Sequence, residues 1–186
     1  NNQNNNNNHH TIIHERDILM EVKMYEDSHN VAGIVEMLGC GITSDGPYLI
    51  VEHFGINLTQ FLSNRILPIM ERINLYIEIC VAVCSLHAVG IMHGAITPDN
   101  ILISSSNEQI LQVKLCNLVC SRKIGEAFPV NSLGNLRSYP GYIAPEVYFG
   151  RVGICRATTK IDAFCLSIIG SNLLSRKPSI HKHLLP

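Results

Sequence analysis

The sequence has little charge, no long apolar run and no paired cysteines. Only 16% of its 186 residues are charged and the net charge is −1, so no basic excess suggests nucleic acid or an acidic membrane surface. The longest apolar run, residues 79–92, is interrupted by Ser85 and His87 and is too short to span a bilayer. We therefore predict a protein with neither a nucleic-acid nor a membrane partner.

Cysteine usage and the polar N-terminus predict the compartment. The seven cysteines are an odd number, and they are spread over apolar segments without paired spacing, as is usual for reduced thiols. The first residues are polar and form no signal peptide. Both features predict a cytoplasmic protein, and the 46% hydrophobic content predicts a globular one.

The N-terminal third predicts a tail, a helix and a hairpin. Residues 1–10 are almost entirely asparagine and histidine, so we expect them to be disordered. Residues 11–29 carry the apolar spacing of a helix. The apolar stretches 34–38 and 48–54 predict two antiparallel strands, joined by a Gly-rich turn over residues 39–47.

The rest of the chain predicts three helices around a second hairpin. Residues 58–64 predict a short helix, and residues 71–88 a longer one that is apolar almost all round and hence buried. Strands are predicted at 101–103 and 110–116 around a polar turn. Residues 162–174 predict an apolar helix with Asp162 as its N-terminal cap.

The stretch His93-Gly94-Ala95-Ile96-Thr97-Pro98-Asp99-Asn100 is a tight loop before an apolar strand. It resembles the catalytic loop of eukaryotic protein kinases, His-Arg-Asp-Leu-x-x-x-Asn. His93, Pro98 and Asn100 match that pattern, and the last two favour the serine/threonine branch. Gly94 stands in place of the arginine and Ala95 in place of the catalytic aspartate.

Further kinase-like signatures follow in the family's order. Asn117-Leu118-Val119 stands where the family has Asp-Phe-Gly, and Ala144-Pro145-Glu146 matches the motif that closes the activation segment, here residues 133–142. The resemblance implies an α+β, protein-kinase-like fold that is incomplete, with a partial N-lobe of one helix and a strand pair and a mainly helical partial C-lobe. We assign residues 11–55 to the N-lobe remnant and 56–186 to the partial C-lobe. No Gly-rich phosphate loop precedes the first helix, so we expect a fragment or a shrunken relative.

The resemblance also implies roles for single residues. Val51, Glu52 and Phe54 stand at the hinge that holds adenine, Leu102 at the floor of that site, and Asn100 at a metal ligand. Glu21 is the candidate for the glutamate that pairs with a lysine in the family, and Glu15 is the alternative. Structural roles are implied for His93, Pro98, Leu118, Glu146 and Asp162, the last through hydrogen bonds to the catalytic-loop backbone.

The departures from the family pattern lie at the chemical positions Gly94, Ala95, Thr97 and Asn117. Alanine has no side-chain acceptor for a proton, and Mg²⁺ prefers a carboxylate to an amide. We therefore expect an inactive kinase-like domain, a pseudokinase that binds or scaffolds a protein partner, with weak or no binding of ATP and Mg²⁺. Two alternatives stay open: an active serine/threonine kinase with atypical residues, in which Asp99 supplies the carboxylate, and a remnant without function.

Overall fold

The computed structural model describes residues 15–44, 46–63, 65–106, 109–129, 140–149 and 153–175. The predicted tail at residues 1–10 and most of the predicted activation segment lie outside these residues, as does the side chain of Glu15. No helix among the described residues is both long and apolar enough to cross a membrane.

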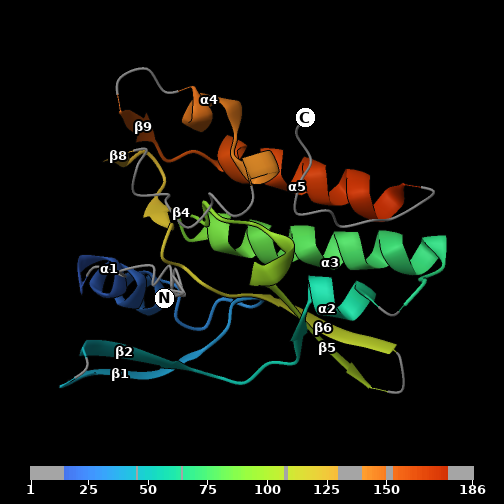
Figure 1. Cartoon of the computed structure of the whole chain (residues 1–186), viewed down its shortest axis with the longest axis horizontal. Helices are drawn as coiled ribbons and strands as arrows, with labels where there is room; N and C mark the ends of the chain where they lie inside the picture. The colour runs from blue at the N-terminus through green and yellow to red at the C-terminus, as the bar shows by residue number, and fades with distance from the viewer. Residues whose placement is uncertain are drawn as a thin grey trace, which may run out of the picture.

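The centre of the molecule is an antiparallel helix pair over a small sheet (Figure 1). Helix α3 (Ile69–Ala88) lies between α5 (Thr159–Leu174) on one side and the hairpin of β5 (Ile101–Ser106) and β6 (Gln109–Leu115) on the other. Buried side chains of α3, such as Leu75, Ile79 and Leu86, form one hydrophobic core with Ile101, Ile103 and Leu115. The short β3 (Ile56–Asn57) extends this sheet beside β5, and α2 (Leu58–Ser63) follows it directly.

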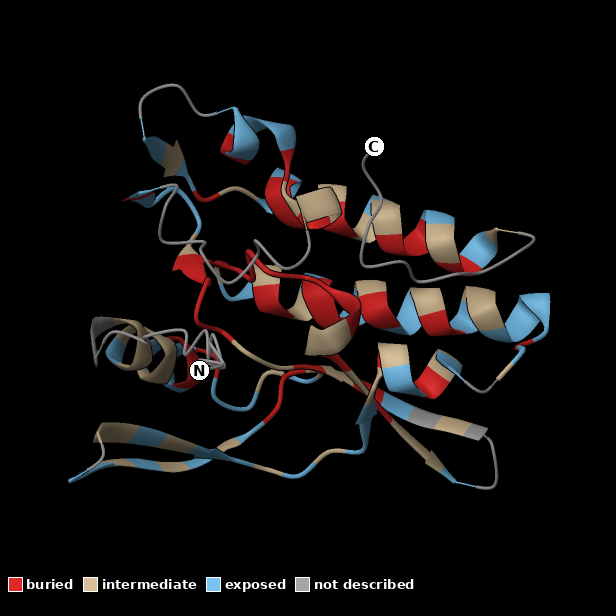
Figure 2. Ribbon diagram, in the orientation of Figure 1, coloured by how far each residue is buried: buried red, intermediate tan, exposed pale blue. Residues whose placement is uncertain are grey.

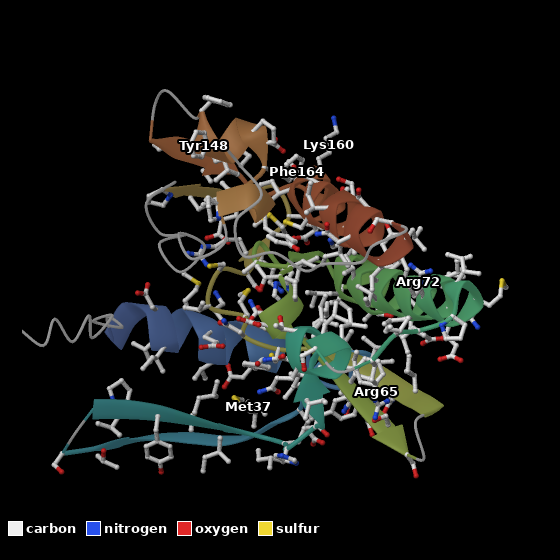
Figure 3. The ribbon with its side chains drawn as sticks, turned by 45° about the vertical axis from the view of Figure 1, so that its right-hand side comes forward. Met37, Arg65, Arg72, Tyr148, Lys160 and Phe164 are labelled. Atoms are coloured by element: carbon white, nitrogen blue, oxygen red, sulfur yellow. The ribbon has the colours of Figure 1, made fainter. Side chains whose placement is uncertain are left out.

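The N-terminal part is a helix and a separate hairpin. Helix α1 (Glu15–Asp27) buries Met24 and Tyr25 but leaves Leu19 exposed. The hairpin of β1 (Met37–Thr43) and β2 (Gly46–Val51) extends away from the helical layer, and it carries no buried residue in Figure 2. Met37, labelled in Figure 3, lies at the end of β1 nearest the core.

Small elements complete the C-terminal part. Their buried side chains belong mainly to a second hydrophobic core cluster, which includes Met92, Ala95, Phe128 and Ile161. The elements are β4 (Ile91–Met92), the 3-10 turn η1 (Pro98–Asn100), β7 (Arg122–Lys123), β8 (Ala127–Pro129), η3 (Pro140–Tyr142), α4 (Pro145–Tyr148) and β9 (Ile154–Arg156). Strand β4 pairs with β7, and β8 pairs with β9.

Several predicted boundaries are wrong. The second strand, β2, ends at Val51, so residues 52–54 of the predicted strand 48–54 lie outside it. Residues 39–43, predicted as a turn, form most of β1, because the alternating glycines Gly39 and Gly41 concealed an exposed strand. Ile34 makes only an isolated bridge to Leu115 and belongs to no strand. Thr158 occupies the N-cap position of helix α5 without a side-chain capping hydrogen bond, so Asp162 lies in the first turn and is not the cap.

The C-terminal end of α5 is held by a side chain from α3. Arg72 Nη1 donates to the carbonyl oxygens of Leu173, at 3.1 Å, and Ser175, at 2.8 Å. These carbonyls have no partner within their own helix, and a cation is favourable at this end of the helix dipole. Figure 3 shows Arg72 near the start of α3, beside the end of α5.

Candidate functional site

The loop between β4 and η1 is held in place by hydrogen bonds to one buried carboxylate. Asp162 accepts hydrogen bonds from the backbone N–H groups of His93, at Oδ2, and Gly94, at Oδ1, each at 2.8 Å. Its Oδ2 also lies 2.7 Å from His87 Nε2, which donates to it. Asp162 is fully buried, so these donors replace the water that its charge loses on folding. Position 162 thereby connects α5, α3 and the loop.

Gly94 takes a backbone conformation that suits glycine. Its φ is +75°, in the left-handed region that other residues adopt at a cost. A Cβ built at Gly94 would also lie 2.7 Å from the carbonyl oxygen of Cys120, closer than real Cβ atoms come. The residue that departs from the expected arginine therefore relieves the loop of strain.

His93 is a buried structural ring. Its Nδ1 accepts from the N–H of Ala95 at 3.2 Å, so Nε2 carries the proton and donates to the carbonyl oxygen of Cys116, also at 3.2 Å. Burial lowers the pKa of His93, which keeps the ring neutral in this arrangement. The ring joins the loop to the end of β6.

Asn100, the expected metal ligand, is hydrogen-bonded to Asn117, which stands in place of the family's metal-binding aspartate. Asn100 Nδ2 donates to the carbonyl oxygen of Ala95 at 2.9 Å, which turns Asn100 Oδ1 toward Asn117. Asn117 Nδ2 donates to that Oδ1 at 3.2 Å. Asn117 has a φ of +66°, a conformation that asparagine tolerates better than most residues. The Ala95 side chain is a buried methyl group and adds no acceptor.

Helix α1 holds the segment that follows β6. Glu21 accepts a hydrogen bond from the N–H of Leu118 at 3.0 Å, and the hydroxyl of Tyr25 accepts one from the N–H of Asn117 at 3.1 Å. Burial raises the pKa of Glu21, although the Leu118 hydrogen bond offsets part of this effect. Burial likewise raises the pKa of Tyr25, so its hydroxyl stays protonated. Leu118 is fully buried in the main core.

The expected hinge residues gather around Lys114. Its ammonium group forms an ion pair with Glu52 and lies 4.8 Å from the centre of the Phe54 ring. Lys114 pairs across the strands with Leu102, so the two side chains share a face of the sheet. Val51 is exposed at the end of β2. Burial raises the pKa of Glu52, but the hydrogen bonds from Lys114 and the Glu36 N–H bring it below its ordinary value.

The remaining expected positions lie at the edge of the loop. Asp99 Oδ1 accepts from the Thr59 hydroxyl of α2 at 2.8 Å. Thr97 and Pro98 are buried where η1 begins, and the carbonyl oxygen of Thr97 accepts from the N–H of Asn100. Glu146 is exposed in the first turn of α4.

The residues present do not fit a Mg²⁺–nucleotide complex. Mg²⁺ is usually held by carboxylates, and here the two positions are neutral amides that satisfy each other. No group of three or more His, Cys, Asp or Glu side chains in the described part of the chain is arranged to hold a metal. A cavity of about 190 Å³ lies nearby, lined by Tyr25, residues 28–37, Gln112 and Lys114, but it contains none of the expected nucleotide-site residues.

Sequence reasoning missed three residues that organise the site: His87, Tyr25 and Lys114. Tyr25 follows Glu21 by four residues, so the two share one face of α1, and this spacing was a usable signal. Lys114 alternates with Val113 and Leu115 in β6, which predicted only that it faces away from the core. The role of His87 depends on α5 and has no local signal.

Comparison with known proteins supports the arrangement described here. Residues 2–184 match the model of the family "Protein kinase domain". The chain is 33% identical over 137 residues to serine/threonine-protein kinase D3 of Mus musculus, and 29% identical over 143 residues to serine/threonine-protein kinase Pkn1 of Myxococcus xanthus. These matches cover 72% and 76% of this chain but only 15% and 20% of the relatives. The chain therefore spans a small part of the length of either protein.

A solved structure shows the same fold. The kinase PK-1 of Cydia pomonella granulovirus superposes with a TM-score of 0.64 at 17% sequence identity. The match covers 86% of this chain and 56% of the viral kinase. The predicted fold class, α+β and kinase-like but incomplete, is confirmed.

Proposed function

The chain belongs to the protein kinase family, and we propose that it is a catalytically inactive member whose kinase fold serves as a protein-binding module. The scaffold contacts are present, since Asp162 holds the loop and Glu21 holds the segment at Leu118. The groups that would perform chemistry are replaced by neutral ones at positions 95 and 117.

The observation that carries this proposal is the hydrogen bond from Asn117 to Asn100. Phosphoryl transfer relies on positioning and on neutralising the charge of the phosphates, which metal ions supply in kinases. A cation entering here would have to displace the amide of Asn117 from Asn100 Oδ1 and would gain no anionic ligand from either residue. We infer weak or absent nucleotide binding of the Mg²⁺-dependent kind.

The absence of a general base at position 95 also lowers the expected rate of phosphoryl transfer. General acid–base assistance contributes typically about 10²–10⁴-fold to rate. Ala95 offers a methyl group at the position of the base, and the loss of base and metal need not be additive. Both changes lower the rate of transfer to a hydroxyl substrate.

The alternative, an active kinase in which Asp99 replaces the lost aspartate, finds less support. Asp99 Oδ1 is bonded to Thr59 of α2. Asp99 lies within the turn η1 (Pro98–Asn100), and this hydrogen bond directs its side chain toward α2. A base at this position would have to leave that contact before it could reach a substrate.

A phosphotransfer assay tests the proposal. Purified protein is incubated with radiolabelled ATP, Mg²⁺ or Mn²⁺ and generic serine/threonine substrates, beside a mock preparation. The proposal predicts no transfer above the mock, to itself or to the substrates. Transfer that survives purification and is abolished by Asn100→Ala would establish an active kinase, because a contaminant would not respond to that substitution.

A further inference from the structure

Helix α3 presents an apolar stripe to solvent on the face opposite the core. Met70, Ile77 and Val81 are 62%, 51% and 53% exposed, and Cys84 continues the stripe. Steps of seven, four and three residues separate these positions, so they align along one side of the helix. The exposed Asn74 lies between Met70 and Ile77 on the same side, and with it the steps alternate between four and three residues. This is the spacing by which one helix packs against another.

The opposite face of the same helix is already used. Leu75, Ile79, Ala82, Val83 and Leu86 are buried in the main core. In Figure 2, exposed and buried segments alternate along α3 for this reason. The sequence predicted a helix buried all round, and the outward stripe is where that prediction is wrong. Its side chains are those of a buried helix, yet the described chain leaves them in water.

One edge of the stripe is acidic. Glu71 and Glu78 are exposed, lie seven residues apart and therefore flank the stripe on the same side. The one Lys or Arg of α3 is Arg72, which is turned to the end of α5 and does not offset this charge. The stripe thus combines apolar contact area with a negative border on one flank.

We propose that this face of α3 is a docking surface for an amphipathic helix of a partner protein that carries lysine or arginine along the flank facing Glu71 and Glu78. The apolar stripe would bury the partner's apolar face, and the acidic flank would fix its orientation. The inference rests on the binding role proposed above in assigning a protein partner, but the surface is separate from the loop of His93 to Asn100.

The charge distribution argues against a second copy of this chain as the occupant. Two copies packed antiparallel through the same stripe, related by a two-fold axis, would bring the flank of Glu78 alongside the same flank of the other copy. Like charges so placed oppose association. A partner helix with basic residues on that flank has no such penalty.

The test uses the whole 186-residue protein and two designed helical peptides. One peptide has leucines at three- and four-residue steps with lysines along one flank, and the other has glutamates in place of the lysines. Fluorescence anisotropy should show tighter binding of the lysine peptide. Ile77→Gln with Val81→Gln should weaken binding of the lysine peptide at least about tenfold, since two apolar side chains are lost from the contact. Ile42→Gln on the β1–β2 hairpin is the matched control and should leave binding unchanged.

Charge reversal gives the second readout. Glu71→Lys with Glu78→Lys should reverse the preference, so that the glutamate peptide binds better. These substitutions are at the surface and should leave the fold unchanged by circular dichroism. Equal binding of both peptides, or binding insensitive to the Ile77 and Val81 substitutions, would overturn the proposal. So would sedimentation showing a dimer that Ile77→Gln with Val81→Gln dissociates. None of these outcomes bears on catalysis, which the phosphotransfer assay tests by itself.

Discussion

The side-chain amide of Asn117 donates a hydrogen bond to Asn100 Oδ1 at 3.2 Å, across the position where the family holds its metal. Asn100 is itself anchored to the carbonyl oxygen of Ala95. The two asparagines therefore complete a neutral network in which each polar atom named has a partner of this chain. These hydrogen bonds between side chains and backbone of this chain hold the loop in its observed shape.

Gly94 should tolerate no side chain without a measurable loss of stability. Gly94→Ala should lower the free energy of unfolding by about 1–2 kcal/mol because of the positive φ at this position. The close contact of the new Cβ with the Cys120 carbonyl oxygen should lower it further. Gly90→Ala is the matched control, because Gly90 has nearly the same φ, +77°, but open space at the Cβ position. Urea unfolding should rank the variants wild type, Gly90→Ala, Gly94→Ala in order of falling stability. Equal losses for the two variants would show that the contact costs nothing.

Removal of the Asp162 carboxylate should destabilise the domain strongly. Asp162→Ala leaves the buried N–H groups of His93 and Gly94 without this acceptor, at about 1–3 kcal/mol each. We expect a loss of about 2–6 kcal/mol on that basis. Thr59→Ala breaks one side-chain hydrogen bond at the edge of the loop and should cost far less. A loss for Asp162→Ala no larger than that of the control would contradict the anchoring role.

Glu21 should contribute a pH dependence of known sign. Its pKa is raised by burial above the ordinary value of 4.5, so the folded state binds the proton more tightly than the unfolded state. The contribution to stability is fully present below about 4.5 and is lost as pH rises through the raised pKa. Glu21→Gln keeps an acceptor for the Leu118 N–H and has no charge to desolvate, so its stability relative to wild type should increase with pH.

Glu21→Ala is the companion variant for that experiment. It leaves the Leu118 N–H without its acceptor and should cost about 1–3 kcal/mol at low pH, and this cost should shrink as pH rises because the wild-type protein then loses stability. Urea unfolding at several pH values between 4 and 8 measures both effects. If the glutamine variant were as unstable as the alanine variant, the hydrogen bond to Leu118 would not be the role of this side chain.

The β1–β2 hairpin should make the isolated chain prone to self-association. Its two strands pair only with each other in the described chain, and Ile42 and Ile50 are 81% and 49% exposed. Unpaired strand edges with apolar side chains are sites of aggregation. Ile42→Lys and Ile50→Lys should lower light scattering on heating without lowering Tm, whereas Leu49→Lys, which is packed against the core, should lower Tm. A sharp melt of a dilute wild-type monomer near or above about 60 °C would contradict this expectation.

Long, strongly patterned segments were predictable from the sequence, and side-chain contacts were not. The α3 and β5–β6 segments have apolar periodicity over many residues, so their existence and order followed from local physics. Most of strand β1 was missed because Gly39 and Gly41 read as turn residues, although the Tyr48 ring occupies the place that a side chain at Gly41 would fill. The departures at positions 94, 95 and 117 were visible as residue types. That Asn117 would bond to Asn100, and Asp162 to both His87 and the loop, depends on tertiary packing that no local pattern encodes.

Restoring both carboxylates should rebuild only part of the site. Ala95→Asp with Asn117→Asp replaces the donor amide that now contacts Asn100 Oδ1 by an anionic acceptor, which favours a cation between the two residues. Glu21 would still be hydrogen-bonded to Leu118. The phosphates would be loosely positioned, so much of the ~7–11 kcal/mol by which correct positioning can lower the activation barrier would be lost. We expect weak Mg²⁺-nucleotide binding by this double variant and no turnover near the kinase range of about 1 s⁻¹ or more.

Calorimetric titration of the wild-type protein with ATP, with and without Mg²⁺, tests whether the Asn100–Asn117 pair replaces the metal site. We expect that Mg²⁺ does not strengthen any ATP binding by the wild-type protein, while it does strengthen binding by Ala95→Asp with Asn117→Asp. Mg²⁺-dependent ATP binding by the wild-type protein that is lost in Asn100→Ala would show the opposite, namely that the two asparagines hold a metal between them.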